Sequence, residues 1–171
     1  MRYKAILFDM DGTLLDTLTD MADAVNHILS VHGWPLRTTE EVRAFVGNGA
    51  RRLMERAVPP EVTGGDFEAV LTEYRDWYQA HNCVATAPYP GIPALLAALA
   101  EAGIKTAVVS NKPDATTKTL AARFFPGLPA FGQRDDVPPK PAPDLVFRAL
   151  ETLGVDAADA VYVGDSEVDV A

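Results

Sequence analysis

The stretch Ile6-Leu7-Phe8-Asp9-Met10-Asp11-Gly12-Thr13-Leu14-Leu15-Asp16 decides the fold, because an apolar run ends there in two aspartates. A short apolar run of this kind is typical of a buried strand in a parallel sheet. Open α/β sheets bind ligands at the carboxyl ends of their strands, which is where Asp9 and Asp11 stand. Side chains at i and i+2 of an extended chain point the same way, so we expect both carboxylates to reach one bound group. Such a pair suits phosphoryl transfer, with one acid as nucleophile and the other as proton carrier.

A second apolar run, Thr106-Ala107-Val108-Val109, ends in Ser110-Asn111-Lys112-Pro113. The Ser110 hydroxyl and nearby backbone N–H groups could bind phosphate oxygens, helped by the N-terminus of the following helix. A helix N-cap without any ligand is the commoner explanation of a Ser or Asn at such a place. This segment therefore supports a phosphate site only together with the others.

A lysine between prolines forms the third segment, Val137-Pro138-Pro139-Lys140-Pro141-Ala142-Pro143. The prolines stiffen the backbone in an extended conformation, so we expect Lys140 to be presented from a defined position. A fixed ammonium beside a phosphate would offset charge on the nucleophile and on the transferring group. A solvated loop lysine is the alternative interpretation.

The fourth segment, Ala160-Val161-Tyr162-Val163-Gly164-Asp165-Ser166-Glu167-Val168-Asp169, again ends a strand in acidic residues. Carboxylate oxygens at Asp165 and Asp169 are the hard ligands that Mg²⁺ prefers. Acids near a helix N-terminus also complement the helix dipole, and this is the interpretation we accept for Glu167. Together the four segments supply a nucleophile, an acid/base group, a phosphate anchor, a cation and metal ligands.

In their order these segments resemble the motifs of the haloacid dehalogenase-like (HAD) superfamily. The matching residues are Asp9-x-Asp11-Gly12-Thr13, Ser110-Asn111, Lys140-Pro141 and Gly164-Asp165-Ser166-x-x-Asp169. Within the superfamily the chain is most similar to the phosphoglycolate phosphatase group, on residues 45–50, 53–57, 89–91 and 110–113. The resemblance implies a Mg²⁺-dependent phosphatase that hydrolyses a small phosphomonoester, 2-phosphoglycolate, through an aspartyl-phosphate intermediate.

The resemblance also implies a role for each site residue. Asp9 would attack phosphorus, and Asp11 would protonate the leaving alkoxide and then take a proton from water. Phosphoryl oxygens would be bound by Ser110, Asn111 and Lys140. The implied metal residues are the acids Asp9, Asp11 (through its backbone carbonyl), Asp165 and Asp169.

The periodicity of apolar residues predicts two parts of the chain. Residues 16–85 show the helical period of 3.6, which predicts a small helical bundle whose first helix is capped by Thr17 with Asp20. From residue 89 onward helices at 92–102, 113–125 and 143–153 alternate with strands at 105–110 and 160–163, which predicts a parallel sheet covered on both faces. We therefore expect an α/β fold: a Rossmann-like core of residues 1–15 and 86–171 with an inserted helical cap at 16–85.

Substrate choice is expected to lie in the cap, which in the resembled family closes over the active site. Gly47, Asn48 and Gly49 could present amide groups to a small carboxylate, and Arg51 or Arg52 could add positive charge. A plain helix–helix break with solvated arginines explains the same residues as well.

Composition limits the class of protein. A net charge of −9 over 171 residues argues against nucleic-acid binding, which needs a basic face. Cys83 is the only cysteine, so no internal disulfide can form, and we expect a cytoplasmic protein. No apolar stretch reaches membrane-spanning length, so we expect no membrane partner. His27, His32 and His81 lack zinc-ligand spacing. The expected partner is a small phosphorylated metabolite, and the chain is expected to be a monomer or a homodimer.

Two further expectations complete the sequence analysis. Members of the superfamily continue past the fourth motif, so we interpret the C-terminal part of the core as missing and the chain as a fragment, with an uncovered sheet edge. The rival functions are a phosphomutase like β-phosphoglucomutase, and an inactive homologue that only binds a phosphorylated ligand.

Overall fold

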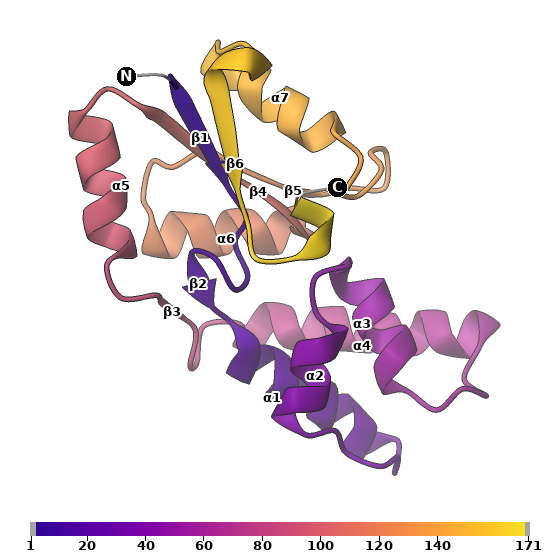
Figure 1. Ribbon diagram of the computed structural model, residues 1–171. Helices are drawn as coiled ribbons and strands as arrows, with labels where there is room; N and C mark the ends of the chain where they lie inside the picture. The colour runs from indigo at the N-terminus through magenta and orange to yellow at the C-terminus, as the bar shows by residue number, and fades with distance from the viewer. Residues whose placement is uncertain (1–2, 170–171) are drawn as a thin grey trace. The chain divides into compact units, whose positions relative to one another are not determined.

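The computed structural model describes residues 3–169, which form two compact units. One unit contains the chain up to Asp16 and from Ala87 onward, and the other runs from Thr17 to Thr86 (Figure 1). Each boundary differs by one residue from the one expected from the helical period.

The first unit is built on a four-stranded parallel sheet in the order β5-β4-β1-β6. Its strands are β1 (Ala5–Phe8), β4 (Lys105–Pro113), β5 (Ala130–Gln133) and β6 (Ala160–Val163). In the pairing register Phe8 lies between Val108 of β4 and Val163 of β6. The residues that follow Phe8 and Val163 therefore lie beside the last part of β4, which continues to Pro113.

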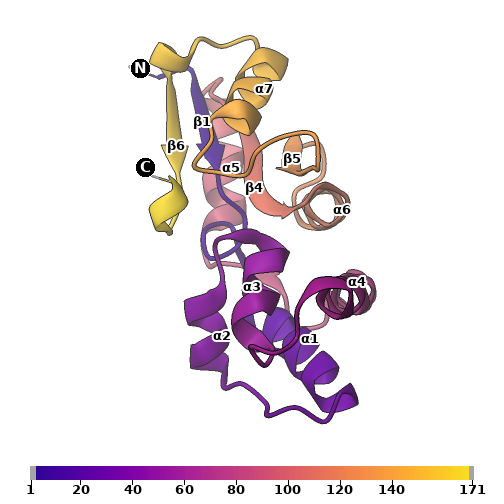
Figure 2. The same cartoon turned by 90° about the vertical axis from the view of Figure 1, so that its right-hand side faces the viewer.

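Helices cover both faces of this sheet, as the alternating pattern predicted. On one face α7 (Asp144–Leu153) packs Leu145, Ala149 and Leu150 onto Leu7 and the strand residues around it. On the other face α5 (Ile92–Glu101) and α6 (Asp114–Phe124) pack against β4 and β5 (Figures 1 and 2). The α/β fold class expected from the sequence is confirmed.

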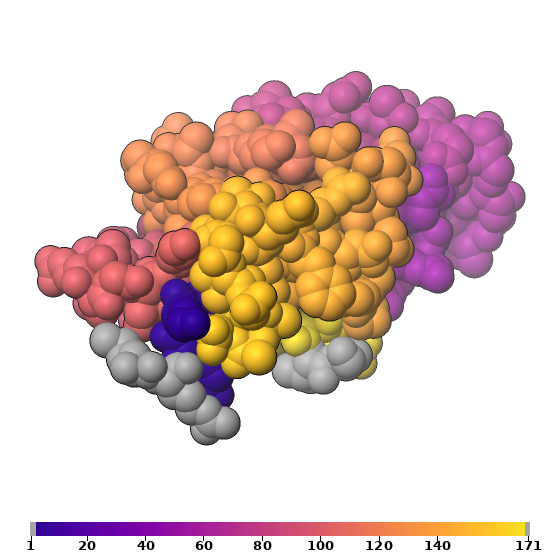
Figure 3. Space-filling view, turned by 90° about the horizontal axis from the view of Figure 1, so that it is seen from above, coloured from indigo at the N-terminus to yellow at the C-terminus, as the bar shows by residue number. Residues whose placement is uncertain are grey.

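Among residues 3–169, β6 is the last strand at its side of the sheet, and its pairing partner is β1. Val163 of β6 is exposed, and α5 has no buried residue although its sequence is almost wholly apolar. In the space-filling view α5 (salmon) stands at the edge of the unit, whereas α7 and β6 (orange to yellow) are closely packed together (Figure 3).

Three short strands, β2 (Leu15–Asp16), β3 (Ala87–Pro88) and β5, were not predicted from the sequence. β5 carries the sequence AFGQ, which shows no apolar alternation and contains a glycine, so periodicity could not reveal it. β2 and β3 are two-residue strands that pair antiparallel where the chain leaves and re-enters the first unit. β4 also runs three residues beyond the expected end at 110, with a shift in register against β5 between Val109 and Pro113.

The second unit is a bundle of four helices: α1 (Leu18–Val31), α2 (Thr39–Phe45), α3 (Gly49–Ala57) and α4 (Gly64–His81). One apolar core joins them, with fully enclosed side chains such as Leu29, Met54 and Leu71. Among residues 3–169 no helix has both the length and the apolar character needed to cross a membrane.

The expected cap of α1 is not formed as a Thr17–Asp20 pair. Thr17 is the N-cap residue but its side chain makes no capping hydrogen bond. The buried Asp20 carboxylate instead accepts hydrogen bonds from the backbone N–H groups of Val84, Ala85 and Thr86, at 3.0, 2.8 and 2.9 Å, and from the Thr86 hydroxyl at 2.7 Å. The contact joins residues more than sixty positions apart, which a local capping pattern cannot predict.

Candidate active site

The first aspartates lie where β1 turns out of the sheet. The Asp9 N–H donates to the Val163 carbonyl at 2.8 Å, which ties the exit of β1 to that of β6. The next carbonyl, of Met10, accepts from the N–H groups of Leu14 and Leu15 at 3.0 and 2.9 Å, so the chain turns back there. Each of the two carboxylates has a different lysine as its partner, and the expectation that both reach one bound group stays a prediction.

Lys140 is the partner of Asp9. Its Nζ donates to Asp9 Oδ1 at 2.8 Å, to Asp169 Oδ1 at 2.7 Å and to the Tyr162 hydroxyl at 2.8 Å. The Lys140 and Asp9 residues are only 5% and 7% exposed, so this charge pair is held almost out of water. Tyr162 in turn donates its hydroxyl proton to the Val109 carbonyl of β4 at 2.7 Å. The ammonium is thus fixed by three oxygen atoms, one from the first segment and two from the fourth.

Burial and charge act in opposite directions on the acids. Burial raises the pKa of Asp9 to about 6, against the lowering effect of Lys140, and the nearby charge of Asp11 adds to the rise. For Asp169 burial also raises the pKa, but hydrogen bonds from Lys140 and Ser166 outweigh it and hold the pKa below its ordinary value. The pKa of the Tyr162 hydroxyl is raised, chiefly by burial and by the Asp9 charge, so the hydroxyl stays protonated.

Three acids form a cluster with the character of a metal site. Carboxylate oxygens of Asp9, Asp165 and Asp169 lie within 4.8 Å of one another. Thr13 donates its hydroxyl to Asp165 Oδ1 at 3.2 Å, which orients that side chain. Mg²⁺ prefers hard oxygen donors and usually takes one or two carboxylates together with water and phosphate, which this cluster can supply. The donor set therefore fits Mg²⁺.

Gly12 and Gly164 lie so close to two of these acids that neither position has space for a side chain. A Cβ atom on Gly12 would collide with the Asp165 carboxylate, and one on Gly164 would collide with the Asp169 side chain. Gly12 also has a φ of 84°, a conformation that residues with a Cβ rarely adopt. Both glycines thus allow close approach between the backbone and the acidic cluster.

The side chain of Asn111 contacts the backbone of Lys140. Its side-chain Oδ1 accepts from the Lys140 N–H at 2.7 Å, and its Nδ2 donates to the Lys140 carbonyl at 3.1 Å. These two bonds fix the backbone of Lys140 on both sides of its Cα, and both partners are buried. The peptide between Lys140 and Pro141 is cis. The contacts of Asn111 make it a support for the lysine, while binding of phosphoryl oxygen by Asn111 stays a prediction.

Lys112 has a prominent place in the site although the sequence analysis assigned it no role. Its Nζ contacts both oxygens of Asp11, at 2.9 and 3.0 Å, and its side chain is only 4% exposed. Ser110, also buried, accepts the Lys112 N–H on its hydroxyl oxygen at 3.2 Å. The sequence placed Lys112 two residues after Ser110, at the end of a predicted strand. That position does not reveal its partner, which lies 101 residues away.

The residues expected to select the substrate belong to the helical unit. Asn48 is the N-cap of α3, directly after Gly47, and makes no side-chain capping bond. Arg51 forms a two-point ion pair with Glu68, at 2.8 Å for each bond, and Arg52 pairs with Glu55 at 2.7 Å. A role of these residues in substrate selection stays a prediction.

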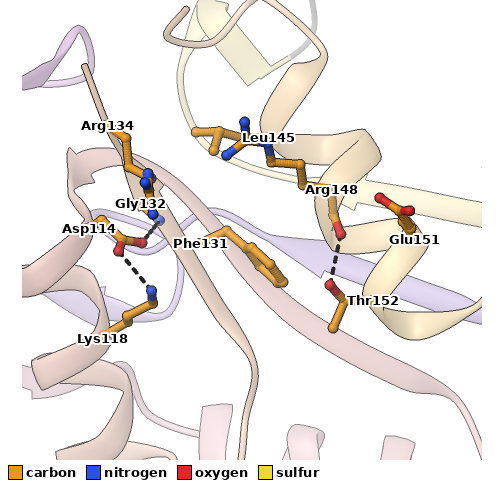
Figure 4. Close-up of a pocket in the computed structure, with 9 residues that line it drawn as sticks. All are labelled: Asp114, Lys118, Phe131, Gly132, Arg134, Leu145, Arg148, Glu151 and Thr152. Carbon is orange, nitrogen blue, oxygen red and sulfur yellow. Dashed lines mark hydrogen bonds and ion pairs between the residues drawn. The ribbon is translucent and has the colours of Figure 1, made fainter. Parts of the chain in front are cut away.

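A separate hollow of about 360 Å³ lies between β5, α6 and α7 (Figure 4). None of the predicted site residues lines it. Its cations are matched by acids, since Lys118 pairs with Asp114 at 2.7 Å, and Arg134 and Arg148 pair with Asp136 at 3.0 and 3.6 Å. With Glu151 also in the lining, the three cations at the hollow are balanced by three acids.

Comparison with known proteins places the chain among hydrolases. A family model described as haloacid dehalogenase-like hydrolase matches residues 3–171. An N-acetylmuramic acid 6-phosphate phosphatase of Pseudomonas aeruginosa is 35% identical over 99% of this chain and 76% of its own length. A phosphoglycolate phosphatase of Pseudomonas savastanoi pv. phaseolicola is also 35% identical, over 98% of this chain and 64% of its own length. The crystal structure of a predicted phosphoglycolate phosphatase from Haemophilus somnus 129PT matches with a TM-score of 0.91 at 28% identity, over 99% of this chain and 80% of that one. The chain spans less than two thirds of the second relative and about three quarters of the first.

Proposed function

Because this chain belongs to the haloacid dehalogenase-like hydrolase family, we propose that it is a phosphatase that hydrolyses a small phosphomonoester, 2-phosphoglycolate, through an aspartyl-phosphate. The observation that carries the proposal is the buried Asp9–Lys140 pair beside the cluster of Asp9, Asp165 and Asp169. A carboxylate that could serve as nucleophile, a fixed cation and a set of oxygens that could bind a metal lie together at one end of the sheet. These are the groups that phosphoryl transfer requires.

In the first step an Asp9 oxygen bonds to phosphorus while the bond from phosphorus to the ester oxygen breaks. Asp11 gives its proton to the departing alkoxide, so that a neutral alcohol leaves. In the second step water attacks the aspartyl-phosphate, Asp11 takes the proton of the water, and inorganic phosphate leaves with Asp9 restored. The bond count balances over the two steps, and both Asp9 and Asp11 return to their starting state.

The surrounding residues would lower the barrier of these steps through charge and position. Lys140, fixed by three oxygens, would stabilise charge on the transferring phosphoryl group. Ser110 would bind a phosphoryl oxygen through its hydroxyl. Asp9, Asp165 and Asp169 would hold Mg²⁺, with the Asp11 carbonyl as the ligand implied by resemblance. When bound, the ion would neutralise negative charge shared by phosphate and Asp9.

The substrate is a separate question, because two relatives of equal identity carry different printed names. N-acetylmuramic acid 6-phosphate is therefore the second candidate substrate, favoured by the relative of which this chain covers the larger share. Both candidates are phosphomonoesters, so the same residues would serve either. The proposal for 2-phosphoglycolate rests on the group resemblance and on relatives of that name.

The experiment is release of inorganic phosphate from both candidates and a panel of simple phosphomonoesters, with Mg²⁺ and with a chelator. Asp9→Asn is the test variant, and Asp23→Asn, an exposed acid in the helical unit, is the matched control. We expect chelator-sensitive release that disappears in Asp9→Asn and persists in Asp23→Asn. Transfer of phosphate between sugar hydroxyls without net release would indicate the phosphomutase. Thermal stabilisation by the esters without any turnover would indicate the binding protein.

A further inference from the structure

The ion pair between Lys112 and Asp11 is the part of the site to which the proposed mechanism gives no task. Nζ of Lys112 contacts Asp11 Oδ1 at 2.9 Å and Oδ2 at 3.0 Å. The two side chains are 4% and 13% exposed, so neither lies in solvent. A buried ion pair is weak evidence for stability, because desolvation of two charges offsets much of their attraction. Stability alone therefore does not explain why Lys112 lies against Asp11.

The geometry constrains Asp11 more than a single contact would. An ammonium that bonds both oxygens of one carboxylate fixes the rotation of that group as well as its position. An ionised carboxylate offers about four lone-pair sites, and Lys112 uses one on each oxygen. The contact therefore restricts the directions from which the Asp11 carboxylate can give and take a proton.

The backbone of Lys112 is itself held in place. Its N–H donates to the Ser110 hydroxyl at 3.2 Å, and its carbonyl accepts from the Thr117 hydroxyl at 3.1 Å. Both Ser110 and Thr117 are buried, on β4 and α6 respectively. The ammonium that contacts Asp11 is thus anchored by the sheet and the helix that follows it, away from the turn that carries Asp9 and Asp11.

We propose that Lys112 is the positioning residue of Asp11: it holds that carboxylate from the end of β4 so that it faces the leaving oxygen and then the attacking water. The inference rests on the proposed function and adds a residue to it. Lys140 serves Asp9 and Lys112 serves Asp11, so each acid of the turn has its own cation. A displacement of a reacting group by about 1 Å can slow an enzyme by about a hundredfold, so such positioning has a measurable effect.

The test compares an alkyl phosphate with p-nitrophenyl phosphate, whose leaving group departs without a proton. For Lys112→Met we expect kcat on the alkyl ester to fall by about 10- to 100-fold, with a smaller change in KM. With p-nitrophenyl phosphate the initial burst of p-nitrophenolate should persist, because formation of the aspartyl-phosphate then needs no proton. Steady-state turnover should still fall, because its hydrolysis needs Asp11. Lys112→Arg, which keeps a cation able to bond two oxygens, should recover most of the rate.

A double-mutant cycle distinguishes loss of positioning from loss of folding in Lys112→Met, because a misfolded protein would also lose activity in the Asp11→Asn background. Asp11→Asn combined with Lys112→Met removes both charges, and we expect this protein to turn over at the rate of Asp11→Asn alone. Lys118→Met, a lysine with a 57% exposed side chain in the same unit, is the matched control and should behave as wild type. A further loss in the Asp11→Asn background, or equal loss of burst and turnover, would overturn the inference. Wild-type turnover by Lys112→Met would also overturn the inference. A wild type silent on every ester would instead contradict the proposed phosphatase.

Discussion

Asn111 bonds both polar groups of the Lys140 backbone, accepting from its N–H at 2.7 Å and donating to its carbonyl at 3.1 Å. The strand β4 thus holds the loop that carries the buried ammonium. The same arrangement occurs once more in the helical unit, where Asn26 accepts from the Arg37 N–H and donates to its carbonyl, each at 2.9 Å. The Asn26–Arg37 pair can therefore serve as a control for the Asn111–Lys140 pair in the site.

Asn111→Ala should reduce turnover by about tenfold or more, because Lys140 loses its fixed position beside Asp9. Asn26→Ala removes the same number of hydrogen bonds of the same kind, and we expect it to lose stability but keep activity. Either variant should lower the free energy of unfolding by about 1–3 kcal/mol. Phosphate release and urea unfolding on both variants check this prediction. Equal activity of the two proteins would contradict a special role for Asn111.

Asp9→Asn should make the metal-free protein more stable at neutral pH while it abolishes turnover. The folded-state pKa of Asp9 is raised to about 6 from 3.8, so the folded protein binds that proton more tightly than the unfolded chain does. Stability is therefore lost as pH rises between these two values, to an extent of about 3 kcal/mol, and an uncharged Asn avoids the loss. The check is urea unfolding in chelator at neutral pH and at about pH 4, where most of the difference should be gone. A variant less stable than wild type at neutral pH would refute the argument.

Asp165→Ala should raise the Mg²⁺ concentration that gives half-maximal activity by about tenfold or more, because the cluster loses one of three oxygen donors. Glu167→Ala is the matched control, since Glu167 is an exposed acid two residues from Asp165 and from Asp169 and is not part of the cluster. Titration of activity with Mg²⁺ distinguishes the two. An unchanged titration in Asp165→Ala would remove this residue from the metal site.

Gly12→Ala should impair activity more than its backbone conformation alone explains. The new Cβ would collide with the Asp165 carboxylate and push it out of the acidic cluster. Gly103→Ala is the control, because Gly103 has a similar positive φ of 72° but no atom within 4 Å of the added Cβ. Both variants should lose about 1–2 kcal/mol of stability from the left-handed backbone. Only Gly12→Ala should need more Mg²⁺ for half-maximal activity, and equal Mg²⁺ requirements would show that the collision has no functional effect.

Asp20→Ala should destabilise the helical unit by about 3 kcal/mol, because three backbone N–H groups lose their common acceptor. Asp23→Ala, on the exposed side of the same helix, should change stability by less than about 0.5 kcal/mol. Thermal or urea unfolding of both proteins measures the difference. Similar stability of the two would mean that water replaces Asp20 as the acceptor for residues 84–86.

The sequence by itself determined the α/β class and the positions of most strands and helices. Apolar runs that end in polar residues located β1, β4 and β6, and the positive-φ glycines Gly103 and Gly154 stand where the predicted helices end. These features depend on residues a few positions apart, so local periodicity and backbone preference suffice to reveal them. The strand β5 was missed because its four residues carry no such pattern.

Tertiary structure alone decided which residues meet in the site. Lys140 reaches Asp9 across 131 positions, and Lys112 reaches Asp11 across 101. The register of β1 with β4 and β6 brings these segments to one end of the sheet, and no local pattern encodes that register. The pairing of each acid with a different lysine, and of Asn111 with the Lys140 backbone, depends on how β4 meets the loops that follow β1 and β5. A sequence motif supplies the types of group required by the chemistry, whereas the packed sheet sets their partners and distances.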